Sequence, residues 1–193
     1  MGDNINTVDL EYFPSFTIDG KKMIFCRRIN SDEDFYESEL VNGVWSKAHP
    51  LGGRVNTDMN EAAQTISQDG QLLIFTGCNY PEGAGSCDLY FSIRTNNGWS
   101  EAQNIGPAIN TEFWESSPSL SPDKRDLYFA SNRPGGFGGK DIWVSHRLSN
   151  GRWSRPENLG EAVNTSGDES CLFMHADNET LYFNSNGHPG YGL

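Results

Sequence analysis

The sequence predicts an all-β fold, a β-propeller, on two observations. The first is an internal repeat: several residue series recur at steps of 50, 54 and 54 residues, and self-similarity at a fixed period is the signature of repeat architectures. The second is that each repeat holds short apolar runs bounded by Pro, Asp and Gly, with no helical period. A unit of this length with four short strands has the size and content of one propeller blade.

Four series of residues define the repeat. They are Glu11, Glu61, Glu115 and Glu169 before the first strand, Asp19, Asp69, Asp123 and Asp177 in the next turn, Phe25, Phe75, Phe129 and Phe183 in the second strand, and Asn6, Asn56, Asn110 and Asn164 in an Ile/Val-Asn-Thr tripeptide. Their spacing places blades at about 11–57, 61–111 and 115–165, and a partial blade at 169–193. Because closed propellers have roughly four to eight blades, residues 1–193 are expected to be a single propeller fragment of a larger ring.

The third repeat shows the expected content of one blade. Strands are predicted at 117–121, 126–131 and 141–147, and a fourth runs from Trp153 to Asn158. In the second strand the residues at 127–129 are all apolar. Since successive side chains on a strand point to opposite faces, this strand is expected to be covered on both faces, as it is when a blade lies between two others.

The turn after the first strand varies among the repeats. Gly20 and Gly70 follow the turn Asp in the first two repeats and suit a positive φ, whereas Lys124 and Asn178 stand there in the last two. Lys adopts the left-handed region only at some cost, so a different turn type is expected in the later repeats.

The charge balance narrows the classes of partner. With 26 acidic and 14 basic residues the net charge is −12, which argues against nucleic acid and anionic membrane surfaces as direct partners and suits basic proteins or divalent ions. No apolar run approaches the ~20 residues that a membrane span needs, so no membrane insertion by this segment is expected. Residues 1–4 show no signal-peptide pattern.

Several motifs carry a family resemblance. Ser-Pro-Ser-Leu-Ser-Pro-Asp at 117–123, Leu-Tyr-Phe-Ala-Ser-Asn-Arg at 127–133 and Asp-Ile-Trp-Val at 141–144 resemble the TolB-type, WD-like propeller repeat. Together with Gly-Gly-Phe-Gly-Gly-Lys-Asp at 135–141 and Asn-Leu-Gly at 158–160, they resemble propellers of OmpA-family, peptidoglycan-associated outer-membrane lipoproteins of the Bacteroidota. The resemblance implies a periplasmic or outer-membrane-associated scaffold with protein partners in the cell envelope. It implies no catalytic residues.

The four cysteines fall into two groups. Cys78 and Cys87 flank a loop between the second and third strands of blade two, and a hairpin brings such positions close. They form either a disulfide or two reduced thiols, and the periplasmic location that the resemblance implies favours the disulfide. Cys26 and Cys171 lie within expected strands and are predicted to be buried free thiols.

The repeated Glu residues have two interpretations. Near one mouth of a central channel, Glu11, Glu61, Glu115 and Glu169 could bind a cation such as Ca²⁺. Alternatively, each Glu caps backbone N–H groups of a neighbouring blade. This structural role is favoured, because a residue that recurs in every blade more often has a structural role in the blade. No cofactor is therefore expected. The repeated Asn side chains are expected to brace the turn after the fourth strand.

Two functional hypotheses remain. No nucleophile with its base is recognisable, so the leading hypothesis is a non-catalytic propeller that presents loops to protein partners. The alternative is a propeller that binds or processes glycans, with Trp114 and Phe137 as stacking surfaces because these aromatics depart from the repeat.

The partial blade should leave apolar surface and a strand edge uncovered, so we expect the chain to self-associate through its open ends or to fray from Glu169 onward.

Overall fold

The computed structural model describes residues 2–190, and every element of secondary structure named in that range is a β-strand. Blade one holds β1 (Leu10–Phe16), β2 (Lys22–Ile29), β3 (Asp32–Val41), β4 (Val44–Trp45) and β5 (His49–Pro50). Blade two holds β6 (Asn60–Ile66), β7 (Leu72–Cys78), β8 (Cys87–Thr95), β9 (Gly98–Trp99) and β10 (Gln103–Asn104). Blade three holds β11 (Glu115–Leu120), β12 (Asp126–Ser131), β13 (Asp141–His146) and β14 (Glu157–Asn158), and blade four holds β15 (Glu169–Met174) and β16 (Leu181–Ser185). No helix that could cross a membrane occurs among the described residues.

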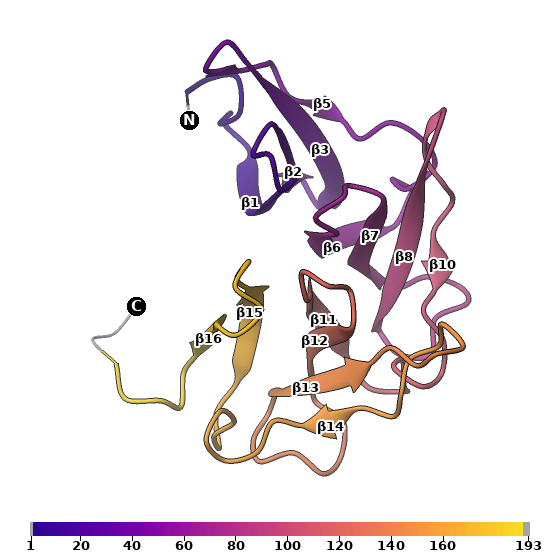
Figure 1. Ribbon diagram of the computed structural model, residues 1–193, viewed down its shortest axis with the longest axis vertical. Coiled ribbons are helices and arrows are strands. Elements are labelled where there is room, and N and C mark those ends of the chain that lie inside the picture. The colour runs from indigo at the N-terminus through magenta and orange to yellow at the C-terminus, as the bar shows by residue number, and fades with distance from the viewer. Residues whose placement is uncertain (1, 191–193) are drawn as a thin grey trace.

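The four sheets form an arc around a common centre (Figure 1). Each sheet is an antiparallel meander, and its first strand, β1, β6, β11 or β15, is the innermost. The fourth strand is shorter than the sequence predicts: in blade three only Glu157–Asn158 pairs with β13, while Trp153 forms an isolated bridge to Arg147. The repeated Glu residues lie within the innermost strands rather than before them.

Every innermost strand bulges at the same place in the repeat. The ladder between first and second strands shifts register in all four blades. A residue with positive φ lies at each shift, and these residues are Phe13, Ala63, Ser117 and Cys171. None of them is Gly, so each bulge holds a side chain in a costly backbone region. This repeated bulge was not predicted from the sequence.

The turn after the innermost strand is uniform, contrary to the prediction of a different turn type. Lys124 has a φ of 61° and Asn178 one of 63°, close to the 64° of Gly20 and 69° of Gly70. In blade three Ser121 and Asp123 hold the turn, because their side-chain oxygens both accept from the one backbone N–H of Arg125. The Lys124 ammonium also meets the Asp69 carboxylate of blade two at 2.6 Å, an exposed contact between blades.

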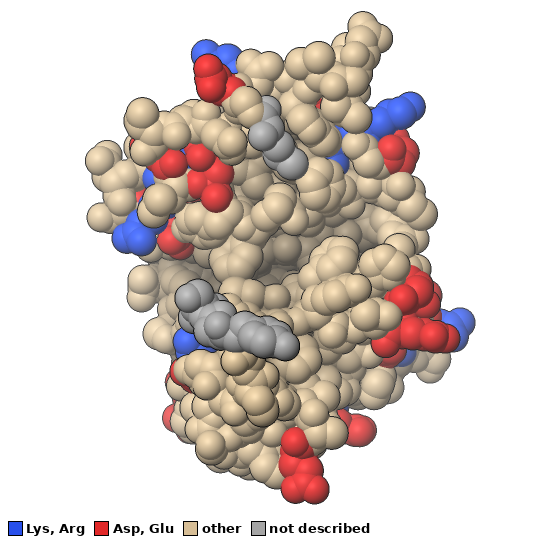
Figure 2. All heavy atoms as spheres, turned by 90° about the vertical axis from the view of Figure 1, so that its left-hand side faces the viewer, with Lys and Arg blue, Asp and Glu red and all other residues tan. Residues whose placement is uncertain are grey.

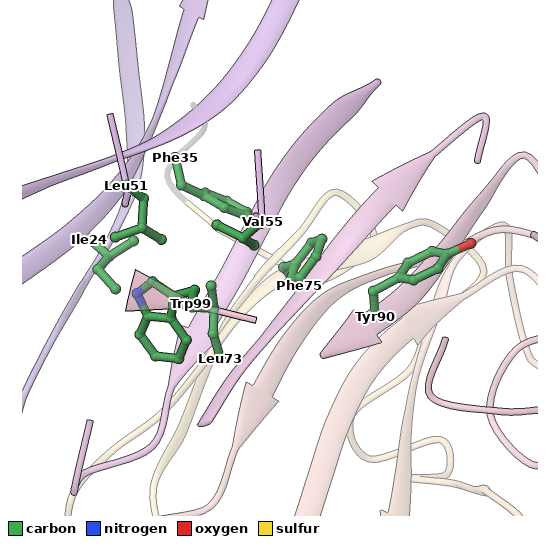
Figure 3. Close-up of a cluster of buried hydrophobic side chains, with 8 residues drawn as sticks. All are labelled: Ile24, Phe35, Leu51, Val55, Leu73, Phe75, Tyr90 and Trp99. Atoms are coloured by element: carbon green, nitrogen blue, oxygen red, sulfur yellow. The ribbon is translucent and has the colours of Figure 1, made fainter. Parts of the chain in front are cut away.

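The hydrophobic core lies between adjacent blades. One cluster joins Phe35 of blade one to Phe75 and Tyr90 of blade two, and the Phe35 and Phe75 rings meet edge to face at 5.3 Å (Figure 3). A second cluster joins Ile74 and Leu89 of blade two to residues of blade three. This arrangement explains the continuous apolar runs of the second strands, because in blades two and three both faces are covered.

Candidate functional site

Each repeated Glu binds the tripeptide that precedes its blade. In blade three, Thr111 donates its backbone N–H to Glu115 Oε2 at 2.8 Å and its hydroxyl to Glu115 Oε1 at 2.7 Å. Thr57 and Thr165 make the same pair of bonds to Glu61 and Glu169. Thr7 binds Glu11 likewise. The carboxylate therefore fixes the crossing from the outer edge of one blade to the innermost strand of the next.

A further side chain covers each of these carboxylate–tripeptide contacts, and its type differs from blade to blade. Arg27 contacts Glu11 at 2.9 Å and donates to the Ile5 carbonyl. Arg133 contacts Glu115 at 3.1 Å and donates to the Ile109 carbonyl, which is the equivalent acceptor. The remaining two are the Tyr80 hydroxyl, which donates to Glu61, and His188 Nε2, which donates to the Val163 carbonyl. These four residues were missed in the sequence, because no single position of the repeat holds them.

The Glu61 carboxyl differs electrostatically from Glu11 and Glu115. It is fully buried, and no arginine or lysine side chain pairs with it among residues 2–190. Burial raises its pKa from 4.5 to about 7, against the opposing hydrogen bonds from Thr57 and Tyr80. Near neutral pH this carboxyl therefore exists in both protonation states.

This raised pKa predicts a pH dependence of stability. The folded state holds the Glu61 proton up to about pH 7, whereas the unfolded state releases it near pH 4.5, so stability falls as pH rises through this window. The loss is expected to be about 3 kcal/mol, because one pKa unit corresponds to about 1.4 kcal/mol. Urea unfolding between pH 4.5 and 8 should show this component in the parent chain and in Glu82→Gln, an exposed control, but not in Glu61→Gln. An unchanged slope in Glu61→Gln would contradict the assignment.

The repeated carboxylates do not line a common cavity. The central hollow, of about 430 Å³, is lined by the later halves of the innermost strands and the turns after them, and its lining contains no charged residue. Figure 2 shows this hollow as an uncharged surface with acidic groups at its rim. Within residues 2–190 no group of three or more His, Cys, Asp or Glu side chains is placed to hold a metal ion. The geometry matches the capping role that the sequence favoured.

The repeated Asn side chains bind the third strand, and in two blades they also brace the turn after the fourth strand as predicted, because Asn110 donates to Asn104 and Asn164 donates to Asn158. Asn110 accepts the Leu89 N–H and donates to the Leu89 carbonyl, both at 2.8 Å. Asn164 makes the same two bonds with Ile142, and Asn56 makes them with Phe35. The amide thus acts as an additional ladder partner at the outer edge of each complete blade. The prediction missed this because the acceptor strand lies 21–22 residues earlier.

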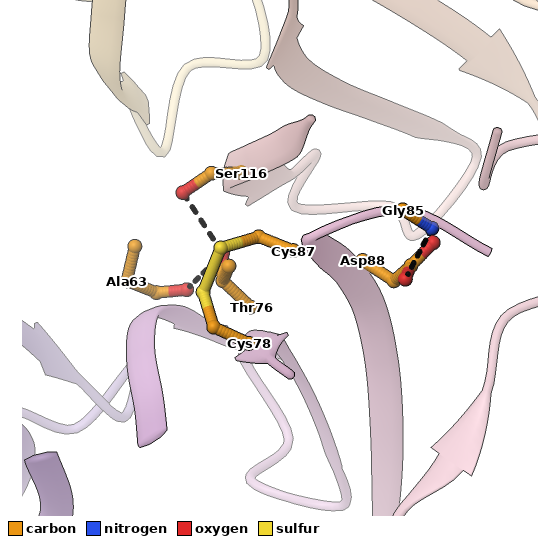
Figure 4. The surroundings of a disulfide bond; sticks show 7 residues. All are labelled: Ala63, Thr76, Cys78, Gly85, Cys87, Asp88 and Ser116. Carbon is orange, nitrogen blue, oxygen red and sulfur yellow. Dashed lines mark hydrogen bonds between the residues drawn. A yellow bond between two sulfur atoms is a disulfide. The ribbon is translucent and has the colours of Figure 1, made fainter. Parts of the chain in front are cut away.

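Cys78 and Cys87 form a disulfide at facing positions of β7 and β8, with their Cα atoms 4.0 Å apart (Figure 4). Cys26 is buried, whereas Cys171 is exposed, so the prediction that both free thiols are buried is wrong for Cys171. Cys171 occupies the bulge of β15 and lines the central hollow, as Phe13 does at the equivalent bulge of β1.

The disulfide leads to a measurable expectation. Thiol titration of the denatured, oxidised chain should find two reactive thiols, and four after reduction. Reduction should lower the free energy of unfolding by about 2–3 kcal/mol, the loop-closure entropy of a ten-residue loop. A finding of four thiols before reduction would contradict the pairing.

In blades two and three, a glycine of the loop between the second and third strands packs against the backbone that leads into the next blade. A Cβ on Gly138 would lie 2.2 Å from the Gly167 carbonyl, and one on Gly85 1.9 Å from the Phe113 carbonyl, so neither position has room for a side chain. Asp141 folds the blade-three loop by accepting the Phe137 and Gly138 N–H groups. The Gly-rich motif therefore serves contact between blades.

The two candidate ligand-contact residues, Trp114 and Phe137, lie in different settings. Phe137 is at the exposed tip of the loop between β12 and β13, with half of its surface accessible. Trp114 is half-buried, and the Lys140 ammonium lies 4.5 Å from the centre of its ring. The two rings make no aromatic contact with each other in the described chain, so they do not form one stacking platform.

Two grooves between blades are further concave surfaces. One of about 510 Å³ separates blades one and two and includes Glu37, Arg94 and Trp99. Another of about 480 Å³ separates blades two and three and includes Phe91 and Trp153. Both grooves are open to solvent.

Comparison with solved structures finds β-propellers. TolB from Acinetobacter baumannii matches with a TM-score of 0.59 and 17% identity, over 93% of this chain and 39% of that one. A structure assigned to TolB of Agrobacterium tumefaciens matches with a TM-score of 0.58 and 17% identity, over 93% and 60%. The α-L-arabinofuranosidase from Lactobacillus brevis matches with a TM-score of 0.55 and 12% identity, over 93% and 65%.

These likenesses bear on the fold alone, because their sequence identities are low. The chain spans less than two thirds of each of these proteins. No family model and no curated protein sequence matches it, so the association with OmpA-family lipoproteins stays a prediction. The chain has the TolB-type β-propeller fold that its sequence predicts.

Proposed function

We propose that this chain is a non-catalytic β-propeller module that binds other proteins, as part of a larger protein of the cell envelope. One observation carries the proposal. The acidic and amide residues that recur in the blades are engaged in hydrogen bonds that hold the blades together, as Glu115 and Asn110 show. What differs between blades is the loops, and variable loops on a rigid scaffold are where binding proteins place recognition.

The surface charge favours a basic partner. The net charge is −12, and Figure 2 shows acidic side chains in several groups around the rim of one face. A field of this sign attracts cationic protein surfaces and repels nucleic acid. Association should therefore weaken as salt is raised, because salt screens exposed charges beyond about 10 Å at 0.1 M.

The proposed compartment is the periplasm or the periplasmic side of the outer membrane. Two observations support it: the TolB-type fold, and the disulfide between Cys78 and Cys87. Disulfides form and persist in oxidising compartments such as the periplasm and are rare in the cytosol.

Site-specific photo-crosslinking tests the proposed binding. A photoreactive residue is placed at Phe137, on the loop before β13, or at Asn150, an exposed turn beyond the other end of that strand. Irradiation in cells is expected to give protein adducts of defined mass from position 137 and few from the matched position 150. Adducts that are equal at both positions, or that contain only carbohydrate, would contradict a loop-directed protein partner.

Glycan binding is the second candidate, favoured by the exposed Phe137 ring and by the likeness to an arabinofuranosidase. It predicts saturable binding of an oligosaccharide that Phe137→Ala abolishes. Under the main proposal neither oligosaccharide binding nor hydrolysis of peptides or arabinosides is expected. Turnover that is lost on replacing one Asp or Glu would show that an active site exists.

A further inference from the structure

Backbone pairing closes the contact between blades one and two. Trp99 N–H donates to the Gly52 carbonyl at 2.9 Å, and Arg54 N–H donates to the Trp99 carbonyl at 3.0 Å. A Cβ on Gly53 would lie 2.2 Å from the Trp99 carbonyl. One on Gly98 would lie 2.5 Å from the Gly52 carbonyl, so this close approach requires glycine at both positions. The Trp99 indole is buried in the core between the two blades (Figure 3).

The contact between blades two and three lacks this pairing. Pro107 and Arg152 take the places, one repeat later, of the two glycines that the close approach requires. The hairpin that leads to Trp153 is also one residue longer: the Ser hydroxyl that holds it binds a carbonyl nine residues later, against eight in blade two. Within residues 2–190 no hydrogen bond engages the N–H or the carbonyl of Trp153. A groove of about 480 Å³ remains, in which Trp153 is only partly buried.

The backbone groups of Trp153 point away from its own sheet. On either side of it, the Arg152 carbonyl and the Ser154 N–H bind β13 and the residues that follow that strand. Since alternate residues of a strand direct their backbone groups to opposite edges, the N–H and the carbonyl of Trp153 point to the outer edge of the hairpin. Trp99 is oriented in the same way, and there these groups hold the connection between blades. At Trp153 they are available to an extended segment that enters the groove.

The two contacts also differ in charge. Between blades one and two, the Arg94 guanidinium lies 3.8 Å from the Glu37 carboxylate. One repeat later Arg147 takes the place of Arg94, and Phe91 takes the place of the glutamate. Arg152 adds a second guanidinium to the groove, and neither it nor Arg147 forms an ion pair within the described chain. The lining contains no Asp or Glu, although the chain has 26 acidic residues.

Apolar side chains form much of the remaining lining. They include Leu72, Ile74, Phe91, Ile93 and Ile105. Ile93 is 47% exposed, and it stands where blade one has Glu39. Blades two and three each contain all four of their strands, so the groove is formed between two complete blades. An apolar surface beside two guanidinium groups complements a ligand that combines an apolar group with carboxylates.

We propose that the groove between blades two and three binds an extended segment of a partner protein, and that this segment carries an apolar side chain next to acidic residues. The apolar side chain packs on Phe91 and Ile93, the carboxylates bind Arg147 and Arg152, and the main chain pairs with Trp153. This proposal goes beyond the loop-directed binding of a basic partner, because it concerns another surface and the opposite charge. It stands whether or not the loops bind a partner.

A short unlabelled peptide tests the proposal by NMR. The probe is acetyl-Gly-Glu-Phe-Asp-Gly-amide, titrated into the full chain while ¹H–¹⁵N spectra are recorded. The Trp153 amide resonance is expected to move saturably, because its N–H gains an acceptor. The Trp99 amide is the internal control and should stay in place, since its N–H is already bonded within the chain.

Two further peptides separate the proposed recognition from general attraction. A peptide with Lys in place of both acidic residues is expected to bind about tenfold more weakly or worse, because it cannot pair with the two arginines. The net charge of −12 acts in the opposite sense, since it attracts the basic peptide. A peptide with Ala in place of Phe should also bind more weakly, because it buries less apolar surface.

Variants of the chain give the reciprocal test. Arg147→Gln combined with Arg152→Gln should weaken binding of the acidic peptide about tenfold or more. Arg125→Gln is the matched control, because Arg125 is exposed and lies outside the lining, and it should leave binding unchanged. Phe91→Glu should abolish binding, because it supplies within the chain the carboxylate that Glu37 supplies in blade one.

Four results would overturn the proposal. The first is equal binding of the acidic and basic peptides, and the second is equal binding of the acidic peptide to the parent chain and the double arginine variant. The third is a Trp153 resonance that does not move at about 1 mM peptide. The fourth is another occupant: displacement of the peptide by equimolar decanoate would indicate a lipid-like carboxylate, and a dimer that the double variant dissociates would indicate a second copy of this chain.

Discussion

Replacing Glu115 by alanine is expected to lower the free energy of unfolding by about 3–5 kcal/mol, because it leaves a buried charge without its partner. Glu115 is fully buried, and it accepts hydrogen bonds from Thr111 and Ser131 in addition to its contact with Arg133. Burial lowers the pKa of Arg133, and the Glu115 charge opposes this effect. Without Glu115 the guanidinium remains in a desolvated site.

Urea denaturation followed by tryptophan fluorescence measures the change. Glu112→Ala is the matched control, because Glu112 is exposed in the same connection, and it should change stability by less than about 0.5 kcal/mol. The double variant Glu115→Ala with Arg133→Met should recover part of the loss, because it removes both charges. A double variant whose loss equals the sum of the two single losses would show that the two side chains act independently.

Replacing Phe75 by alanine is expected to lower the free energy of unfolding by a similar amount, about 3–5 kcal/mol, through lost burial and an unfilled cavity. Phe75 lies between the Phe35 ring of blade one and the Tyr90 ring of its own blade. The loss should therefore loosen the contact between blades as well as blade two itself.

Phe173→Ala provides the comparison for Phe75. Phe173 is 54% exposed on β15, so truncating it removes little buried area and should cost less than about 1 kcal/mol. Chemical denaturation of both variants, with hydrogen exchange of blade one in Phe75→Ala, measures the two effects. Equal losses from the two truncations would contradict a core located between blades one and two.

The sequence predicts the architecture because the fold is repetitive. A strand such as Leu127-Tyr128-Phe129 is apolar on both faces, and the same pattern at a fixed step leaves few alternatives to stacked blades. The repeated bulge could not be predicted. Phe13, Ala63, Ser117 and Cys171 share a backbone conformation and no side-chain property, so the bulge leaves no trace in residue type.

The polar contacts were predictable in part. The capping role of Glu61 and Glu115 follows from their recurrence. Their covering side chains do not, because Arg27 follows its second-strand Phe by two residues whereas Arg133 follows by four, and both still reach equivalent carbonyls. Such convergence depends on loop geometry. The exposure of Cys171 was missed for a related reason, since the bulge that places it at the central hollow leaves no trace in residue type.

The central claim is that each repeated Glu holds one crossing between blades and that the four are not members of one shared site. Amide resonances of Thr7, Thr57, Thr111 and Thr165 test this, because each N–H donates to the Glu four residues later in the chain. In ¹H–¹⁵N spectra of Glu115→Gln, the Thr111 resonance is expected to move strongly and the other three to stay in place. Concerted movement of all four resonances would contradict this account and would indicate a shared site.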